Sequence, residues 1–278
     1  MNWILFALTF YSLVLVGMYL LQTKLVYPGS EERGKPELYG GKEVQEITLK
    51  MDDGILLTHW YTAPDNPKYP VVVAFHGNAG HTGDRLSKLK YLTDMGYGLF
   101  QVEYRGYAGH EGTPSERAFK ADALKAVEWL EGQGYRSDNL IAYGESLGTG
   151  MAIWLASEHP VQAVILEAPY SSIADVAQSK YWFLPVGLLL KDKWHSDKTI
   201  LKVKAPVFIF HGEKDRAIPI KFSRKLLDLV PGEKQSAFFE QGYHMDLYEH
   251  GVEENIQEFL GLYVLPKLGD ETSPEAVN

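Results

Sequence analysis

One segment, Gly144-Glu145-Ser146-Leu147-Gly148, limits the possible folds of this chain more than any other. It follows an apolar run at residues 139–143 and precedes a helix-patterned stretch at residues 151–156. Glycines on both sides of such a serine are typical of a very sharp strand-to-helix turn, because larger side chains would collide with neighbouring elements. The turn exposes the hydroxyl at a helix N-terminus, where backbone N–H groups favour negative charge. We predict that Ser146 is a nucleophile; the alternative is an ordinary glycine-rich turn.

Strand and helix patterns alternate along the rest of the chain. Predicted strands lie at residues 44–51, 56–62, 71–75, 99–104, 140–143, 161–166, 205–210 and 235–240. The first two form a hairpin around the turn Asp52-Asp53-Gly54. Predicted helices lie at residues 84–95, 115–131, 146–158, 221–230 and 252–263. This alternation implies an α/β fold with a mostly parallel, eight-stranded sheet and helices on both faces.

The size and composition of the chain fit one catalytic domain. The 278 residues are enough for a single α/β domain, which we expect at residues 25–268, followed by a flexible tail at 269–278. The net charge of −9, without a basic cluster, argues against a nucleic-acid partner. The absence of cysteine excludes disulfides, a thiolate nucleophile and cysteine metal sites. We expect a monomer.

The N-terminus carries a stretch without charge at residues 3–21. As a helix it is roughly 28 Å long, enough to cross a bilayer core. A cleaved signal peptide would need a basic start and a small-residue cleavage site, neither of which is visible, and a buried core helix would rarely lack every charge. We therefore predict an uncleaved single-pass membrane anchor at residues 1–24. The basic residues that follow it favour a cytoplasmic catalytic domain; they are Lys24, Arg33, Lys35 and Lys42.

Residues 170–204 interrupt the alternation. Their apolar centre, residues 181–190, contains a proline and a glycine, and the whole segment is longer than a simple connection. One interpretation is a core helix with a loop. The other is a short cap whose apolar side chains line an acyl-binding site. In that case the candidate pocket residues are Gly77, Tyr170, Tyr181, Trp182 and Phe183.

A serine nucleophile needs a base, and the base needs an orienting carboxylate. In a parallel sheet of this type the acid and then the histidine follow the serine, at the carboxyl ends of later strands. Asp215 follows the strand at 205–210, with Glu213 as the fallback. His244 follows the strand at 235–240, whereas His250 lies further from the strand end. We predict that Asp215 and His244 complete a triad with Ser146.

The negative oxygen formed during acyl transfer needs two hydrogen-bond donors. One is the N–H of Leu147, the residue after the nucleophile. The other is expected in the loop after the strand at 71–75, where Gly77 lets the backbone bend inward and Asn78 offers its N–H. We expect His76 to be structural, and Arg105 either pairs with a carboxylate or is solvated. No histidine or acidic spacing predicts a metal site, and we expect no cofactor.

Several segments together resemble the α/β-hydrolase superfamily. They are Phe75-His-Gly-Asn-Ala-Gly80, Glu103-Tyr-Arg-Gly-Tyr107, Gly144-Glu-Ser-Leu-Gly148, Ala168-Pro-Tyr-Ser-Ser-Ile173, His211-Gly-Glu-Lys-Asp215 and Gly242-Tyr-His244. The resemblance spans residues 25–265 and is greatest to membrane-anchored α/β-hydrolase-domain proteins, depalmitoylase-like enzymes and serine aminopeptidase-like hydrolases. It implies the same triad and the same two donors. Depalmitoylase relatives anchored by an N-terminal cysteine cluster differ, since an apolar stretch takes its place here.

These observations predict a serine hydrolase that cleaves carboxylic esters or thioesters of small-molecule or lipid-like acyl substrates through an acyl-enzyme. A peptidase that releases N-terminal residues is the first alternative. It would need acidic groups near the site to hold the substrate amine, and the sequence places none there. The second alternative is a non-catalytic, membrane-associated binding protein on a hydrolase scaffold, whose signature would be a missing triad member.

Overall fold

The computed structural model describes residues 3–32, 34–41 and 43–265. Arg33 and Lys42, two of the charges used to orient the anchor, lie outside the described residues, as do the predicted tail and the last residues of the expected catalytic domain. Within the described part, the strands are β1 (Gln45–Lys50), β2 (Leu56–Thr62), β3 (Val71–Phe75), β4 (Gly98–Val102), β5 (Leu140–Glu145), β6 (Ala163–Glu167), β7 (Val207–Gly212) and β8 (Lys234–Phe239).

These strands form one eight-stranded sheet in the order β1-β2-β4-β3-β5-β6-β7-β8. The first two pairings are antiparallel, and every pairing from β4 to β8 is parallel. The predicted mostly parallel sheet is thus confirmed. Because parallel strands end at the same edge, the loops after β3, β5, β7 and β8 all open at that edge.

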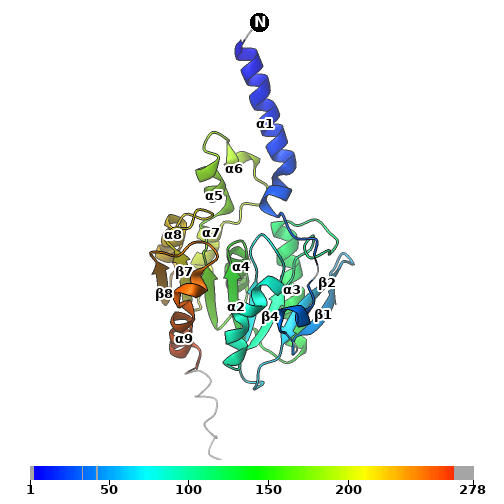
Figure 1. Cartoon of the computed structure of the whole chain (residues 1–278), viewed down its shortest axis with the longest axis vertical. Helices are drawn as coiled ribbons and strands as arrows, with labels where there is room; N and C mark the ends of the chain where they lie inside the picture. Colours follow the sequence, from blue (N-terminus) through cyan, green and yellow to red (C-terminus); the bar gives the residue numbers. More distant parts are fainter. Residues whose placement is uncertain (1–2, 33, 42, 266–278) are drawn as a thin grey trace, which may run out of the picture.

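Helices cover both faces of the sheet, as predicted (Figure 1). Apolar side chains of α2 (Gly83–Asp94) and α9 (Val252–Tyr263) pack on one face. Those of α3 (Glu116–Gly132), α4 (Gly148–Glu158) and α8 (Lys221–Leu229) pack on the other. The strands between them are buried on both sides, which explains their continuous apolar sequences. Short 3₁₀ turns lie at Pro36–Tyr39, Ser137–Asn139, Ile200–Lys202 and Leu247–His250.

Several element boundaries differ from the predicted ones by one or two residues, and two of these differences have a clear local cause. The helix expected from residue 146 begins at Gly148, because Ser146 itself has a φ of 50° and stands outside the helix. The strand expected at 99–104 ends at Val102. The next N–H, that of Glu103, donates to the side chain of His59 on β2 rather than to a backbone carbonyl of a neighbouring strand.

The helix α1 (Trp3–Val26) projects from the edge of the sheet where the loops open (Figure 1). Its most apolar 18-residue window is not buried at all, so α1 is no core helix and is long and apolar enough to cross a membrane. Residues 170–204, which we call the cap segment, form three short helices rather than one core helix. These are α5 (Ile173–Lys180), α6 (Val186–Leu189) and α7 (Ser196–Thr199). α6 contacts α1.

The turn between β5 and α4 is packed so closely that side chains are excluded at both of its glycines. A Cβ on Gly148 would lie 2.1 Å from the Phe75 carbonyl oxygen on β3. A Cβ on Gly144 would lie 2.5 Å from the Gly148 carbonyl oxygen. The two glycines therefore let α4 begin directly against the sheet, as the sequence motif predicts.

Replacing Gly148 by alanine tests this packing. We expect Gly148→Ala to lower the free energy of unfolding by about 1–3 kcal/mol, since backbone atoms must move to admit the methyl group. Gly261→Ala in α9 is the matched control, because nothing lies within 4 Å of its added Cβ and alanine favours a helix. Thermal unfolding in detergent measures both; equal stability of the two variants would contradict the account.

Candidate active site

Ser146 lies at the tip of the turn between β5 and α4 with a left-handed backbone, φ 50°. Its N–H donates to the Glu167 carbonyl on β6 at 2.8 Å, and its own carbonyl accepts from the Thr149 hydroxyl at 2.6 Å. These bonds hold a conformation that non-glycine residues rarely adopt. The strained turn presents the serine hydroxyl at the loop edge of the sheet.

His244 and Asp215 lie in line with this hydroxyl. His244 Nε2 is 3.1 Å from Ser146 Oγ, and His244 Nδ1 is 2.6 Å from Asp215 Oδ2. A carboxylate can only accept a hydrogen bond, so Nδ1 carries the ring proton and Nε2 is left to accept from the serine. The structure thus brings the three predicted residues together, from the loops after β5, β7 and β8. His250 lies elsewhere, 3.8 Å from the carboxylate of Asp246.

Both carboxylate oxygens of Asp215 take part in hydrogen bonds. Its Oδ1 accepts from the N–H groups of Ala217 and Ile218 at 2.7 and 2.9 Å, and its Oδ2 also lies 2.8 Å from His211 Nε2. Burial raises the pKa of the Asp215 carboxyl, but the hydrogen bonds from His211 and His244 outweigh burial and hold the pKa well below its usual range. The carboxylate is therefore charged at neutral pH.

His211 is a second imidazole at Asp215 to which the sequence analysis gave no role. It is fully buried, and its Nδ1 contacts the hydroxyl of Ser223, which in turn donates to the Pro169 carbonyl at 2.7 Å. Its position at the end of β7, four residues before the acid, is the signal that could have identified it. His211 and His244 contact the same carboxylate oxygen, so His211 helps to fix the oxygen that orients the catalytic ring.

A second close backbone approach joins the loops that carry the acid and the base. A Cβ on Gly212 would lie 2.3 Å from the carbonyl oxygen of Gly242, and that carbonyl accepts from the Lys214 N–H at 3.0 Å. Only a glycine at the end of β7 lets the loop after β8 cross this closely. The crossing brings His244 within reach of Asp215.

The two predicted oxyanion donors, Asn78 and Leu147, line the same cavity as Ser146 and His244. The Leu147 N–H belongs to the start of α4, where backbone N–H groups have no partner within the helix. The Leu147 carbonyl accepts from the buried Tyr170 hydroxyl at 3.0 Å, and the Asn78 carbonyl accepts from Tyr107 at 3.1 Å. The Leu147 N–H shares its peptide unit with the Ser146 carbonyl, which accepts from the Thr149 hydroxyl at 2.6 Å. The Asn78 N–H shares its peptide unit with the Gly77 carbonyl, which lies 2.8 Å from His76 Nδ1. These contacts hold both donor peptides in a fixed orientation.

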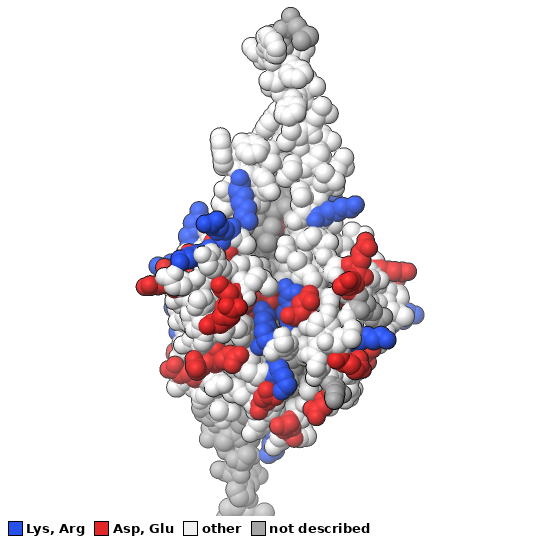
Figure 2. Space-filling model, viewed as in Figure 1, with Lys and Arg blue, Asp and Glu red and all other residues white. Residues whose placement is uncertain are grey.

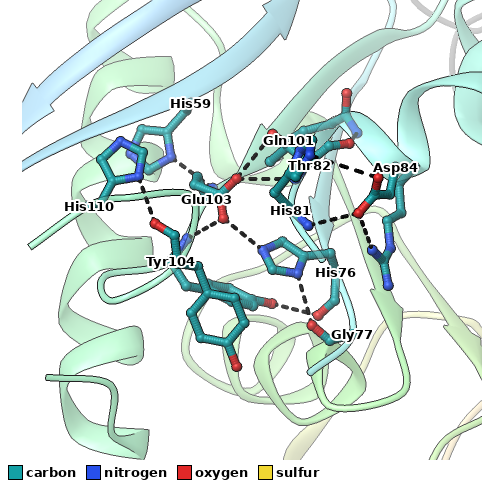
Figure 3. Close-up of polar contacts among 12 residues, drawn as sticks. His59, His76, Gly77, His81, Thr82, Asp84, Gln101, Glu103, Tyr104 and His110 are labelled. Atoms are coloured by element: carbon teal, nitrogen blue, oxygen red, sulfur yellow. Dashed lines mark hydrogen bonds and ion pairs between the residues drawn. The ribbon is translucent and has the colours of Figure 1, made fainter. Parts of the chain in front are cut away.

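The loop that carries Asn78 rests on a buried carboxylate, Glu103 (Figure 3). Glu103 Oε1 lies 3.0 Å from His76 Nε2, and Oε2 accepts from the N–H and the hydroxyl of Thr82 at 3.1 and 3.2 Å. His76 Nδ1 lies 2.8 Å from the Gly77 carbonyl, so both ring nitrogens are engaged within the fold. His76 is thus structural, as expected.

The charge of Glu103 is stabilised by these contacts. Burial raises its pKa, but the His76 ring and the N–H groups of Thr82 and Tyr104 outweigh burial and hold the pKa at about 2.

Arg105, two residues after Glu103, pairs with the buried carboxylate of Asp122 and with Asp53. The structure therefore agrees with the first of the two interpretations of Arg105, an ion pair with a carboxylate, and not with a solvated charge.

A cavity of about 330 Å³ opens at Ser146 between α1 and the cap segment. It is lined by Met18, Gln22, Leu25, Val26, Ile173, Val176, Ala177, Lys180, Tyr181, Leu184, Val186, Leu189, Leu190, Ala217 and Ile218, besides the four residues above. Most of these side chains are apolar, and none of the described lining residues is Asp or Glu.

Only one of the five candidate pocket residues, Tyr181, is among the described residues that line this cavity. Tyr170 is fully buried beneath Leu147, and Gly77 packs against the side chain of Glu145. Trp182 and Phe183 face outward instead and are exposed. The contribution of α1 to the cavity could not be predicted from the sequence, because the pattern of a membrane anchor does not indicate what its last turns contact.

Comparison with known proteins identifies a matching family model and several proteins of similar sequence. A family model described as serine aminopeptidase, S33, matches residues 66–202. An uncharacterized protein of Mycobacterium tuberculosis is 36% identical over 185 residues, which cover 66% of each chain. The lysophosphatidylserine lipase ABHD12 of Danio rerio is 30% identical over an alignment covering 77% of this chain and 67% of the lipase. The chain spans about two thirds of the length of these curated relatives.

Solved structures show a similar fold. The esterase Pf2001 of Pyrococcus furiosus superposes with a TM-score of 0.65, covering 85% of this chain and 98% of the esterase at 14% sequence identity. At this identity the likeness is one of fold, and it includes the sheet that carries the loops described above.

Replacing the acid separates the two acidic candidates of the loop after β7. We expect Asp215→Asn to lower kcat for ester hydrolysis by about 10³–10⁴-fold, because His244 loses the acceptor that fixes its proton on Nδ1. Glu213→Gln is the matched control, since the Glu213 carboxylate pairs with Arg224 at the surface. We expect it to leave kcat unchanged; a similar loss in both variants would contradict the assignment.

Acid unfolding tests the role of Glu103. Its pKa of about 2 lies below the ordinary value of 4.5, so its charge stabilises the fold above about pH 4.5 and this contribution is lost as the pH falls toward 2. We expect Glu103→Gln to be less stable than the wild type at pH 7, by up to roughly 3 kcal/mol, and to lose less stability on acidification. Thermal unfolding against pH measures both, with the exposed Glu258→Gln as control. Parallel pH curves for wild type and Glu103→Gln would refute this role.

Proposed function

The chain belongs to the α/β-hydrolase superfamily and has its fold, and from this we propose that it is a membrane-tethered serine hydrolase that cleaves carboxylic esters or thioesters of lipid-like acyl substrates. The observation that carries the proposal is the line of contacts from Ser146 Oγ through His244 to Asp215, at 3.1 and 2.6 Å. This line ends in an apolar cavity at the loop edge of the sheet.

In the proposed reaction, Ser146 Oγ attacks the carbonyl carbon of the ester while His244 Nε2 accepts the hydroxyl proton. Asp215 keeps the ring proton on Nδ1 and stabilises the imidazolium that forms. The imidazolium then gives its proton to the departing alcohol or thiol, which leaves an acyl group on the serine. Water, deprotonated by His244, releases the acid and restores the hydroxyl.

The negative oxygen of each tetrahedral intermediate would accept hydrogen bonds from the N–H groups of Asn78 and Leu147. Both residues line the cavity beside Ser146. The carbonyls of the same peptide units, those of Ser146 and Gly77, are held by the Thr149 hydroxyl and by His76 Nδ1, so the donors need no reorientation during the reaction. Donors fixed in advance are the most effective at stabilising charge that develops in the transition state.

The lining of the cavity favours an acyl chain over a peptide. Aliphatic side chains from α1, α5 and α6 surround the space next to Ser146. Among the described lining residues, a carboxylate that could hold the free amine of an aminopeptidase substrate is missing. A lipase for a lysophospholipid among the relatives supports the same substrate class. The aminopeptidase description of the family model is therefore the weaker guide.

We propose that α1 is retained as a membrane anchor rather than removed as a signal peptide. The side chain of Gln22 is buried in the domain, where Nε2 donates to the Leu189 carbonyl at 3.1 Å and Oε1 accepts from the Lys191 N–H at 2.7 Å. The last turns of α1 also form a wall of the cavity. Cleavage after α1 would remove that wall and leave the Leu189 carbonyl and the Lys191 N–H without their contacts to Gln22.

Loss of the nucleophile tests the function. We expect Ser146→Ala to abolish turnover of p-nitrophenyl esters and labelling by a fluorophosphonate probe, because no hydroxyl remains beside His244. Ser157→Ala on α4 is the control, since the Ser157 hydroxyl contacts the Trp154 carbonyl at 2.8 Å and the Glu158 carboxylate at 3.4 Å and has no contact with the triad. Labelling that survives in Ser146→Ala would rule out the assignment.

A substrate panel separates the alternatives in the same assay. Acyl esters of graded chain length are compared with an amino-acid p-nitroanilide. Faster cleavage of the esters is the expected outcome, and preference for the p-nitroanilide would favour the peptidase. A folded wild-type chain that cleaves neither would favour a non-catalytic binding protein.

A further inference from the structure

The cap segment is attached to the middle of α1, not only to its base. The hydroxyl of Tyr11 donates to the carbonyl of Phe183 at 2.8 Å. Phe183 belongs to residues 181–188, which we call the cap tip, and which rise beside α1 away from the sheet (Figure 1). This contact fixes the height of the cap tip along the helix.

The height can be converted into a depth in a bilayer. Tyr11 precedes Leu21, the last residue of the uncharged stretch, by ten residues, or about 15 Å along a helix. A hydrocarbon core is about 30 Å thick, and a helix tilt of about 20° changes the depth by only about 1 Å. If the uncharged stretch spans the hydrocarbon core of the bilayer, Tyr11 lies near the midplane of the bilayer. The cap tip bonded to Tyr11 is then inside the hydrocarbon as well.

The side chains of the cap tip suit that position. Leu188 is 87% exposed and Trp182 is 79% exposed, and they belong to a segment that contacts α1 through Phe183 and α6. Large contiguous apolar surfaces of this kind mark protein or membrane contacts. On the face shown in Figure 2, the upper part of the molecule carries no charged side chain among the described residues, and basic side chains lie at its lower border.

Lysines mark where the apolar surface ends. Lys180 immediately precedes the cap tip and Lys191 follows α6. Lys191 Nζ lies 4.6 Å from the centre of the Tyr19 ring, so it sits level with the end of the uncharged stretch of α1. Lysine and tyrosine at one level are typical of the lipid headgroup region. Tyr11, eight residues further out, lies about 12 Å deeper.

The backbone carbonyls of the cap tip have hydrogen-bond donors within the protein, which a segment exposed to water would not need. Gln178 Nε2 lies 3.4, 3.3 and 3.1 Å from the carbonyl oxygens of Tyr181, Trp182 and Leu184. The carbonyl between them, that of Phe183, accepts from Tyr11. The carbonyls of Tyr181 and Leu184 also accept from the backbone N–H groups of Leu184 and Val186 at 2.9 Å, so each of the four consecutive carbonyls has a donor within the protein. Irregular backbone survives in hydrocarbon only when its polar groups are satisfied within the protein.

We propose that the cap tip is immersed in the lipid leaflet next to the catalytic domain, and that the cavity takes its substrate sideways from that leaflet. The cavity lies between the two immersed elements, with Met18 and Leu25 of α1 on one side and Leu189 of α6 on the other. The second statement rests on the proposed function. It narrows the substrate to an ester whose acyl chain is already dissolved in the bilayer.

Immersion can be measured without any turnover. The chain contains no cysteine, so Trp182→Cys, Leu188→Cys and Leu13→Cys each place one environment-sensitive fluorophore in the full-length protein. Leu262→Cys on α9 is the control, because that leucine is also exposed but lies on the helix at the opposite end of the molecule (Figure 1). Phosphatidylcholine vesicles carry nitroxide groups on their acyl chains as quenchers. We expect quenching at positions 182 and 188 close to that at 13 and several times that at 262. Quenching at 13 alone would overturn the proposal.

Substrate entry is tested with the Leu188→Asp variant. Leu188 is exposed and is not among the described residues that line the cavity, so we expect unchanged hydrolysis of soluble p-nitrophenyl acetate. The rate on a long-chain ester embedded in vesicles should fall several-fold, whereas the control Leu262→Asp should change neither rate. Wild-type rates on both substrates in Leu188→Asp would overturn sideways entry. If the wild type hydrolyses neither ester although positions 182 and 188 are quenched, the proposed hydrolase function fails and immersion stands.

Discussion

The close approach of α4 to the sheet at Gly148 is the constraint on which the rest of the molecule depends. The Phe75 carbonyl occupies the space that a side chain at Gly148 would need. The chain can leave β5 and enter α4 there only through a residue with positive φ, and that residue is Ser146. A hydroxyl held in this way points out of the sheet edge, beside the N-terminus of a helix. The loops after β3, β7 and β8 open at the same edge and supply the other polar groups of the site.

Buried ion pairs hold the loops at this edge of the sheet in position. Glu145, next to the serine, accepts two hydrogen bonds from Arg85 on α2, at 3.1 and 2.7 Å, and a further one from Lys88. Burial raises the pKa of the Glu145 carboxyl, but the charges of Lys88 and Arg85 outweigh burial and hold it well below the usual range. Removing one partner of such a pair leaves a buried charge uncompensated, at a cost of about 3–5 kcal/mol. Glu103 anchors the loop of Asn78 in the same manner (Figure 3).

The order of strands and helices and the residues that meet at Ser146 could be predicted from the sequence, because both follow from local patterns. Apolar runs and glycine turns mark the strands, and the parallel sheet brings its loops to one edge. The cavity could not be predicted in the same way. Trp182 and Phe183 look like pocket residues from composition alone, yet they face outward because the walls come from α1 and α6. His211 was missed because a buried histidine has no pattern of its own until its contact with Asp215 is known. Long-range contacts of this kind depend on packing, which a single sequence does not encode locally.

We propose that Ser146 forms a covalent acyl-enzyme with the help of His244. The most direct measurement is mass spectrometry of the full-length protein after reaction with a fluorophosphonate, which modifies only an activated serine. Trypsin releases Ser146 within the peptide of residues 137–180, and fragmentation of that peptide locates the modified residue among its serines. The account predicts an adduct on Ser146 that is lost in His244→Ala. An adduct on another serine, or one of equal yield without His244, would contradict it.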